Sequence, residues 1–310
     1  MPVSVEWEVL VVDNNSTDRT REAVESLSLR FGGRFRYLFE SKQGKSHALN
    51  TGIAEAKGEV LVFVDDDVTV DVDWLRNLTQ PLLEGEWAGA GGRVRPKLAG
   101  PTPNWLPSTD YILGPFGLFD QGDKPCALTK PPIGNNMAFH KGVFRKHGAF
   151  RTDLGPCPGS EIRNEDTELG RRFMTSGEQL CYVASAVVYH LVPEKRIRKE
   201  YFLKWWFDKA RADVRETGFP DDGKWMVWRI PLLSVRRVLR WSLQWMVSAD
   251  PRSRFERKVN VWINVGVILE TYRLSARTQE SYDKKADPSS LPQGVGNVRE
   301  DQARNVSYKV

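Results

Sequence analysis

The first 64 residues alternate between short apolar runs and helix-like segments. The runs are "WEVLVV" (7–12), "FRYLFE" (35–40) and "EVLVFV" (59–64), and "KSHALNTGIAEA" (45–56) between the last two predicts a helix. Continuous apolar runs predict strands buried on both faces, and strands separated by helices predict parallel pairing in a doubly wound sheet. We therefore expect an α/β fold, in which ligands bind beyond the carboxyl ends of the strands.

Two of these strands end in aspartate. The first runs into Asp13, and the third into Asp65, Asp66 and Asp67. Along an extended backbone Asp65 and Asp67 point to one side and Asp66 to the other. Two carboxylates on one side, near a bound diphosphate, make a site for Mg²⁺ or Mn²⁺. A solvated turn after a strand, where Asp is common, explains the same residues without a function.

Between the first two strands, "DNNSTD" (13–18) predicts the start of a helix. Ser16 or Thr17 can cap it, and Asp18 is favourable in its first turn. "GKS" at 44–46 looks like the end of a phosphate-binding P-loop, but that motif requires Gly at position 39, which is Phe39. A dinucleotide-binding G-x-G-x-x-G after a strand is also missing from the sequence, which disfavours a dehydrogenase.

Composition indicates the cellular compartment of the protein. The three cysteines have no metal-ligand spacing, the N-terminus does not resemble a signal peptide, and no run of about 18 apolar residues occurs. We expect a cytoplasmic protein. Charge is uneven: residues 195–258 hold 17 Lys or Arg against 8 Asp or Glu and six of the eleven Trp, which suggests that the two parts of the chain meet different partners.

Four segments together resemble the family 2 glycosyltransferases. They are "EVLVVDNNSTDRT", "GKSHALNTGIAEAKGEVLVFVDDDV", "GNNMAFHKGVF" and "NEDTELGRRFMTSG", in this order, and the resemblance covers roughly residues 6 to 200. It implies an inverting enzyme of the GT-A fold that uses a nucleotide sugar and a divalent metal. The implied architecture is a doubly wound mixed sheet with a helical, basic and Trp-rich C-terminal extension.

The resemblance also implies roles for individual residues. Asp13 would contact the nucleotide base, and the D-x-D pair of Asp65 and Asp67 would hold the ribose and the metal-bound diphosphate. Asp166 of the E-D motif would be the catalytic base, and "GNNMAF" would place Asn136 near the sugar. Three further candidates for the nucleotide-sugar site are Asn50, Asp66 and Arg93, the last in a glycine-rich strand segment where Gly91 and Gly92 permit close backbone approach.

Sugar transfer with inversion needs the same groups on chemical grounds. A carboxylate must take the proton of the acceptor hydroxyl, and a metal can stabilise the departing diphosphate. Asp166 opens a helical segment, and the helix dipole would keep its carboxylate ionised. The segment "NED" also suits an ordinary helix start without a catalytic role. The neighbouring Glu165 is the less favoured base. His190 ends the strand-like "CYVASAVVYH" and is a candidate metal ligand with Asp67, or a structural histidine. Arg196 or Lys195 could clamp phosphate, or form a solvated basic turn.

The sequence departs from the family at its start. Members usually open with a further strand and helix, whereas this chain begins almost at the second strand. We expect a sheet that lacks one member and a base pocket that lacks one wall, which makes an inactive or truncated relative an alternative to an active enzyme.

Residues 96–132 are rich in Pro and Gly and predict a long irregular loop, for which we expect an acceptor-binding lid. Trp105, Tyr111 and Phe116 could stack on sugar rings there, although packing against the domain is the commoner use of such residues.

Beyond His190 the chain changes character. Segments 200–216, 224–247 and 260–274 predict helices, and the tail from about Ser281 predicts disorder. We expect a catalytic domain over 1–195, a helical extension over 196–280 and a tail over 281–310. Basic residues beside Trp and Leu on 224–247 suit binding to an anionic membrane surface. The alternative is a helix packed on the catalytic domain with its arginines in solvent. Binding to nucleic acid is disfavoured because no recognition motif accompanies the charge.

The sequence thus predicts a metal-assisted inverting glycosyltransferase that acts on a saccharide or lipid-linked acceptor, peripheral on the inner face of the cell membrane. A nucleotidyltransferase, which also places acidic residues near a nucleotide, remains an alternative that would not require Asp166 as a base.

Overall fold

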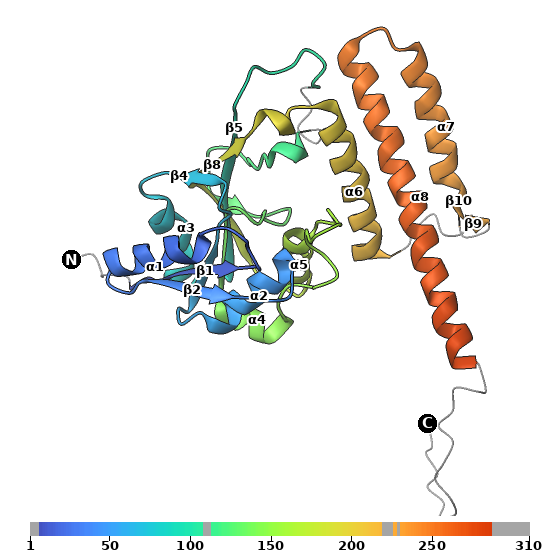
Figure 1. Ribbon diagram of the computed structural model, residues 1–310. Coiled ribbons are helices and arrows are strands. Elements are labelled where there is room, and N and C mark those ends of the chain that lie inside the picture. The colour runs from blue at the N-terminus through green and yellow to red at the C-terminus, as the bar shows by residue number, and fades with distance from the viewer. Residues whose placement is uncertain (1–5, 108–112, 219–225, 228–229, 287–310) are drawn as a thin grey trace, which may run out of the picture.

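The computed structural model describes residues 6–107, 113–218, 226–227 and 230–286, with side chains in the last segment described through Ala276. Figure 1 shows an α/β part built around two sheets, and beside it a layer of three long helices. Tyr111, part of the proposed lid, and residues 287–310 of the expected tail lie outside the described residues.

The N-terminal segment forms a small parallel sheet, as its spacing predicts. β1 (Val9–Asp13) and β2 (Phe35–Phe39) pair in parallel, and α1 (Thr20–Arg30) and α2 (Lys45–Glu55) follow them. The expected capping of α1 by Ser16 or Thr17 is wrong. The backbone N–H of Ser16 instead donates to the Asp13 carboxylate, so the chain turns there and the helix begins later.

A six-stranded mixed sheet forms the centre of the domain. Its order is β3 (Val60–Phe63), β7 (Met137–His140), β5 (Gly89–Leu98), β8 (Leu180–Val192) and β4 (Val68–Val70), with β6 (Cys126–Ala127) also paired to β8. β5 and β8 are parallel and the other pairs are antiparallel. The predicted mixed α/β class is therefore confirmed.

The expected parallel pairing of the third strand with the first two is wrong. Among the described strands, β3 pairs with β7 in antiparallel orientation, and β1 pairs with β2. β7 brings the fully buried Met137, Ala138 and Phe139 beside β3. This burial depends on residues far along the chain, so the local spacing of strands and helices does not reveal it.

Helices cover the central sheet and close its core. The main apolar core joins α3 (Trp74–Leu83), α4 (Lys141–His147) and α5 (Glu165–Thr175) to the strands, and Leu78, Phe139, Phe173 and Tyr182 are fully buried in it. Gly92 in β5 approaches the Asn136 amide and the Ala186 carbonyl so closely that a Cβ atom would collide with both. The prediction of close backbone approach at this glycine is confirmed.

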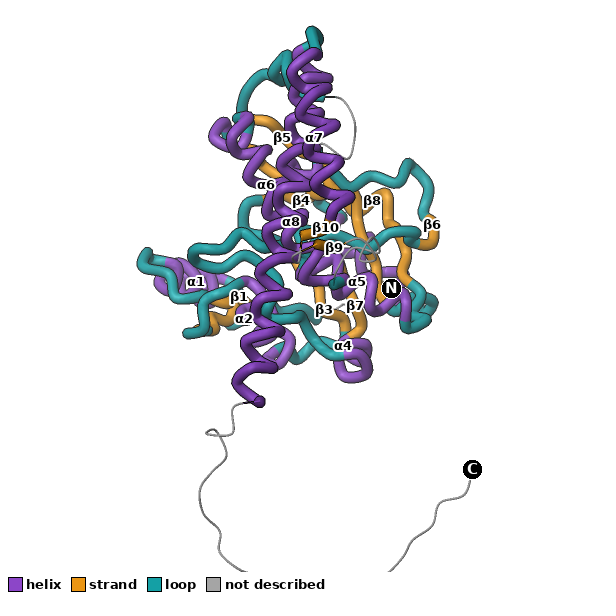
Figure 2. The backbone as a smooth tube through the Cα atoms, turned by 90° about the vertical axis from the view of Figure 1, so that its right-hand side faces the viewer, coloured by secondary structure: helices purple, strands orange, loops and turns teal. Residues whose placement is uncertain are grey.

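The C-terminal region is helical, as predicted. α6 (Lys199–Thr217), α7 (Leu232–Val247) and α8 (Pro251–Ala286) form a layer beside the sheets, and both views show α7 running alongside α8 (Figures 1 and 2). On α8 the buried Glu270 pairs with Arg211 and Arg215 of α6. This ionic group joins the two helices.

Two predicted boundaries in this region are wrong. The helix expected over 224–247 begins only at Leu232, because Pro231 disfavours helical backbone at Ile230, and Met226–Val227 (β9) and Ile230–Pro231 (β10) form a short antiparallel pair instead. Residues 281–286, expected to be disordered, continue α8 to Ala286. A helix already formed upstream extends readily through residues such as Glu, Lys and Ala.

The aromatic residues of the long loop serve packing. Trp105 contacts the rings of Phe202 and Phe255, and the buried Phe116, in the short helix η1 (Gly114–Phe116), contacts Phe202. These contacts attach the loop to α6 and α8 and favour the packing alternative for both side chains. Within the described part of the chain, we find no helix with the length and apolar character that crossing a membrane requires.

Candidate active site

Asp67 and His190 meet because β4 pairs with β8. Val68, the first residue of β4, lies opposite His190, and the backbone N–H of Leu191 donates to the Asp67 carbonyl. This register places the Asp67 carboxylate 3.4 Å from Nε2 of His190. The strand β4 is only three residues long and its pairing was not predicted from the sequence.

The surroundings of His190 orient its ring. Nδ1 lies 2.7 Å from the Phe116 carbonyl, and Nε2 faces Asp67 and Arg196. Burial lowers the pKa of His190, but the Asp67 carboxylate and the Phe116 carbonyl outweigh it and raise the pKa above the ordinary value. The contact with His190, assisted by Arg196, lowers the pKa of Asp67.

Lys45 connects the aspartate-rich turn to α5. Its Nζ atom lies 2.8 Å from the Asp65 carboxylate and 3.5 Å from that of Glu165. Burial opposes the charge of Lys45, yet Asp65 and Glu165 together raise its pKa. Burial also raises the pKa of Glu165 to about 7 in spite of Lys45. Residues 100 positions apart in the sequence thus form one charged cluster.

Asp166 lies in the first turn of α5, as predicted. Its Oδ2 accepts from the backbone N–H of Gly134 at 2.6 Å, and its Oδ1 accepts from the N–H of Thr167 at 2.7 Å. The side chain is half-buried, unlike that of Glu165, which is buried. Each carboxylate oxygen keeps a lone pair beyond these single hydrogen bonds, so the group can accept a further proton or hydrogen bond.

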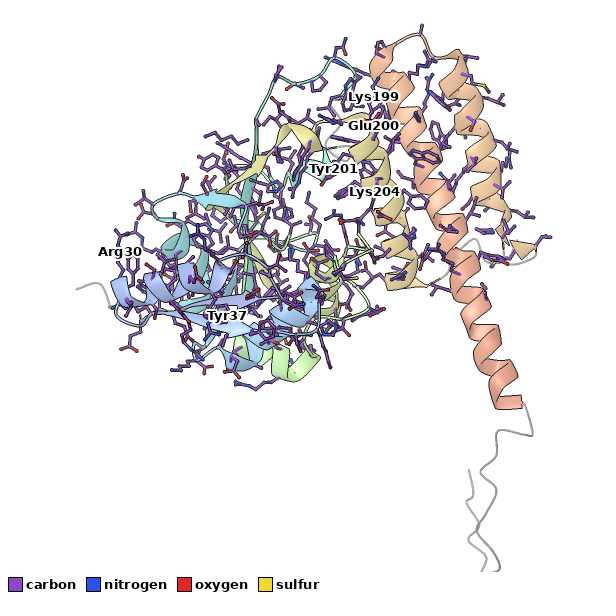
Figure 3. All side chains as sticks on the ribbon, viewed as in Figure 1. Arg30, Tyr37, Lys199, Glu200, Tyr201 and Lys204 are labelled. Atoms are coloured by element: carbon purple, nitrogen blue, oxygen red, sulfur yellow. The ribbon has the colours of Figure 1, made fainter. Side chains whose placement is uncertain are left out.

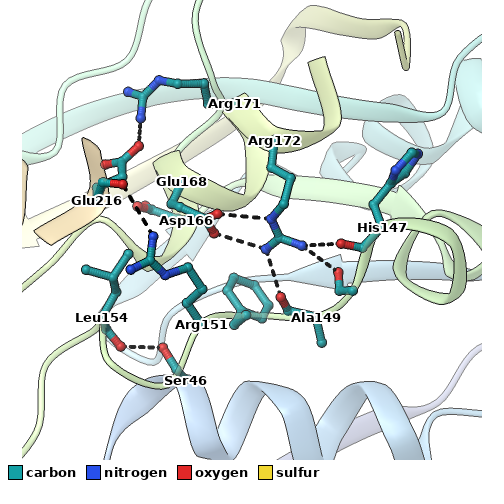
Figure 4. Close-up of polar contacts among 12 residues, drawn as sticks. Ser46, His147, Ala149, Arg151, Leu154, Asp166, Glu168, Arg171, Arg172 and Glu216 are labelled. Carbon is teal, nitrogen blue, oxygen red and sulfur yellow. Dashed lines mark hydrogen bonds and ion pairs between the residues drawn. The ribbon is translucent and has the colours of Figure 1, made fainter. Parts of the chain in front are cut away.

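The segment that surrounds Asp166 is held by α5 and α2 (Figure 4). Arg172 pairs with Glu168 on α5 and donates to the carbonyls of His147, Gly148 and Ala149. Ser46 on α2 donates to the carbonyl of Leu154. These contacts fix the loop between α4 and α5 and thereby the start of α5.

Asp13 ends β1 as a buried carboxylate. Its two oxygens accept from the Ser16 N–H at 2.8 Å and the Tyr37 hydroxyl at 2.7 Å, and these hydrogen bonds, first that of Ser16, lower the pKa of Asp13. Figure 3 labels Tyr37 on β2. Asp13 lies at the carboxyl end of β1, where the sheet geometry predicts a ligand, and Tyr37 reaches it from the middle of β2.

Three predicted donor-binding residues form hydrogen bonds or ion pairs within the protein. The fully buried Asn136 accepts from Trp74 Nε1 and donates to the carbonyls of Arg93 and Ala186. Asn50 exchanges two hydrogen bonds with the backbone of Phe150. These contacts occupy the amides of both residues and argue against a direct contact with the donor.

Arg93 is the third of these residues. Its buried guanidinium contacts Tyr182, Asp120 and Asp123. The remaining candidate, Asp66, is exposed, and it lies with Asp67 in a turn between β3 and β4 rather than along an extended backbone.

Sequence reasoning gave no role to Lys45 and disfavoured Glu165. Lys45 belongs to the GKS segment, which does not fit a P-loop. The sequence feature that points to it is its position at the start of a helix that follows a predicted strand. The burial of Glu165 depends on α2 and α5 coming together, which the local sequence does not reveal.

Asp67 and His190 suit a divalent cation. A carboxylate oxygen suits Mn²⁺ or Mg²⁺, whereas an imidazole nitrogen favours a transition-metal ion over Mg²⁺, and the Phe116 carbonyl supplies the second hydrogen bond that usually orients a ligating histidine. No group of three or more His, Cys, Asp or Glu able to hold a metal occurs among the described residues. The remaining ligands would therefore be diphosphate oxygens and water, as is common for Mg²⁺ bound with a nucleotide.

Comparisons with known proteins show what the chain is similar to. Residues 4–148 match the family model described as glycosyl transferase family 2. The chain is similar to glycosyltransferase AglE of Haloferax volcanii, with 24% identity over 246 residues, 79% of this chain and 72% of the relative. It is also similar to glucosyl-dolichyl phosphate glucuronosyltransferase of the same organism, with 25% identity over 190 residues, 59% of this chain and 60% of the relative.

Among solved structures, the chain is similar to a mannosyltransferase from Pyrobaculum calidifontis in complex with GDP-Man and Mn²⁺. The sequence identity is 18% and the TM-score 0.49, over 91% of this chain and 72% of that one. The family match covers the first three strands, the aspartate-rich turn and β7, and the relatives extend over α5 and β8 as well. The chain thus matches the glycosyltransferase family 2 model over residues 4–148 and is similar to glycosyltransferases over a larger part of its length.

Proposed function

We propose that the protein transfers a sugar with inversion at the anomeric carbon, using Asp166 as general base and a divalent cation held by Asp67 and His190. The acceptor oxygen forms a bond to the anomeric carbon while the bond from that carbon to the diphosphate breaks. Asp166 takes the proton of the acceptor hydroxyl, and the bonding electron pair leaves with the diphosphate.

The cation would stabilise the charge that develops on the leaving diphosphate. Asp67 would hold the cation through a carboxylate oxygen, and His190 would hold it through Nε2. Asp13, at the end of β1, would contact the nucleotide base, and the Tyr37 hydroxyl keeps its carboxylate oriented.

One observation carries this proposal: Lys45 contacts both Asp65 of the donor-side turn and Glu165, the neighbour of Asp166. A donor bound at the turn would therefore have its sugar close to the start of α5. Asp166 is also half-buried, whereas Glu165 is buried against Lys45. This difference favours Asp166 as the base.

The test is the variant Asp166→Asn, assayed with a panel of nucleotide sugars and Mn²⁺. We expect kcat to fall by about 10³-fold or more, while the Kd for the nucleoside diphosphate stays within about twofold, because the base acts on the acceptor and not on the donor. NMR of the product gives the configuration at the anomeric carbon. Retention of configuration, or nearly full activity of Asp166→Asn, would contradict the mechanism.

We further propose that the acceptor is a lipid-linked saccharide at an anionic membrane surface. Supporting this, α7 carries a stripe of exposed apolar residues, Leu239, Leu243 and Met246, at helical spacing, with the exposed Arg236 and Arg240 beside them. An exposed apolar stripe with flanking arginines suits the boundary between head groups and acyl chains. The relative that acts on glucosyl-dolichyl phosphate has such an acceptor by name.

A further inference from the structure

Arg196 occupies the position that a cation would take between the two proposed metal ligands. One of its guanidinium nitrogens, Nη1, lies 3.2 Å from Oδ2 of Asp67 and 3.0 Å from Nε2 of His190. These two ligand atoms lie 3.4 Å from each other. A single positively charged nitrogen therefore contacts both atoms that would bind a metal.

The hydrogen bond on the other side of His190 explains why the ring can accept from arginine. The Phe116 carbonyl can only accept, so Nδ1, at 2.7 Å, carries the hydrogen. When the pH is high enough for the ring to be neutral, Nε2 has a free lone pair, which can accept from the Arg196 N–H. A metal ion would need this same lone pair.

The position of Arg196 in the fold allows it to leave. It is the last residue of the short helix η2 (Glu194–Arg196), which follows β8, and its side chain is about a third exposed. Asp67 and His190 are instead fixed by the pairing of β4 and β8. Of the three residues, Arg196 has the longest side chain and is the one outside the paired strands β4 and β8 and the turn that leads into β4.

We propose that Arg196 occupies the cation site of the free enzyme and exchanges its two contacts for the donor diphosphate when metal and donor bind. This inference rests on the proposed function, because it assumes that Asp67 and His190 hold the metal. Asp67 and a neutral His190 carry one negative charge, which Arg196 balances. A divalent cation in the same place would repel the guanidinium, whereas a diphosphate offers it new oxygen acceptors.

Metal and diphosphate therefore bind with positive coupling. Mn²⁺ alone must displace Arg196 with no compensating partner for it, whereas Mn²⁺ with a nucleoside diphosphate gives the arginine an anion to pair with. Linkage requires that the diphosphate tighten Mn²⁺ binding by the same factor by which Mn²⁺ tightens diphosphate binding. Arg196 acts as a positioning residue that restricts metal binding to the donor complex.

The experiment measures Mn²⁺ binding to the full chain by electron paramagnetic resonance and isothermal titration at pH 8, alone and with UDP or GDP. In Arg196→Gln we expect Mn²⁺ alone to bind about tenfold more tightly than in the wild type, and the coupling to the nucleotide to fall by a similar factor. Arg198→Gln, which removes the same charge from an exposed position two residues away, should match the wild type.

Two further variants separate this inference from the proposed function. Asp67→Ala and His190→Ala should each weaken Mn²⁺ binding in the Arg196→Gln background. Weaker Mn²⁺ binding in these two variants would support the metal site. If Arg196→Gln nevertheless binds Mn²⁺ alone no more tightly than the wild type, the exchange by Arg196 is refuted while the metal site stands. If neither variant affects Mn²⁺ binding, the proposed metal site is itself refuted, and the exchange with it.

Discussion

Glu165 and Asp166 are adjacent in the sequence, yet their carboxylates have different surroundings. Glu165 is buried against Lys45, whereas Asp166 is half-buried and accepts from the backbone of Gly134. Burial of Glu165, which raises its pKa from 4.5 to about 7, means that the folded protein binds this proton more tightly than the unfolded chain does. The stabilisation is present below pH 4.5 and is lost as the pH rises through 7.

We therefore expect the wild type to lose up to about 3 kcal/mol of unfolding free energy, relative to Glu165→Gln, between pH 4.5 and 7. Glutamine keeps the shape of the neutral acid but does not titrate, so the difference between the two proteins isolates this group. Urea unfolding at several pH values measures it. A difference that stays constant across this range would show that Glu165 is already ionised in the folded protein at low pH.

Asn136 gives a second prediction at the scale of the residue. Its amide forms three buried hydrogen bonds, with Trp74 Nε1 and with the carbonyls of Arg93 and Ala186. Asn136→Ala leaves these three groups without a partner, and we expect it to reduce the unfolding free energy by about 2–4 kcal/mol.

The matched control for Asn136 is Asn77→Ala. Asn77 donates one exposed hydrogen bond to the Ser185 carbonyl, so its loss should cost less than about 1 kcal/mol. Chemical denaturation compares the two variants. If Asn136→Ala is as stable as the wild type but binds nucleotide sugar less tightly, the amide contacts the donor as the sequence motif predicts, and the structural role is refuted.

At the scale of elements, the close approach of α6 and α8 depends on Gly266. A Cβ atom at this position would lie 2.5 Å from the Phe207 carbonyl oxygen of α6. Gly266→Ala forces the two helices apart, and we expect it to destabilise the protein by about 1–3 kcal/mol.

Gly142→Ala is the control for this prediction, because Gly142 is also helical but its added Cβ would meet only the end of Arg145, at 3.7 Å. Alanine there should stabilise the protein by up to about 1 kcal/mol through helix propensity. Thermal unfolding distinguishes the two variants. Equal shifts in Tm would mean that α6 and α8 do not pack as closely as described.

At the scale of the whole molecule, α7 belongs to the helical layer beside the sheets (Figures 1 and 2). It carries the stripe of exposed apolar residues Leu239, Leu243 and Met246. If this face binds an anionic bilayer, the protein should cosediment with vesicles that contain phosphatidylglycerol and much less with phosphatidylcholine alone. Substituting Arg236, Arg237 and Arg240 together by Gln should weaken this binding more than tenfold, since each basic residue near the surface contributes about 1 kcal/mol.

A control triple variant replaces the exposed Arg21 and Arg30 of α1 and Arg34, just before β2, by Gln, which removes the same charge from another part of the molecule. It should bind the vesicles like the wild type. Equal loss in both triple variants would indicate a general charge effect, and failure of the wild type to bind would refute the membrane surface.

The local sequence determined most of the helices and strands of the catalytic domain and the motifs that they carry. β1, β2, α2, β3 and α6 lie within a residue or two of the segments that apolar runs and helical spacing predict. The helix that begins beside Asp166 and the strand that carries His190 were predicted in the same way. These features depend on short-range patterns, in which each residue contributes through its own backbone preference and polarity.

The tertiary structure decided which residues meet. The antiparallel pairing of β3 with β7, the register of β4 on β8 and the burial of Glu165 against Lys45 join segments between about 70 and 120 residues apart. It also placed Asn50 and Asn136 in hydrogen bonds with the backbone of distant segments. Such contacts depend on the burial of distant apolar groups and on the compensation of buried charge, and neither is written in the local order of residues.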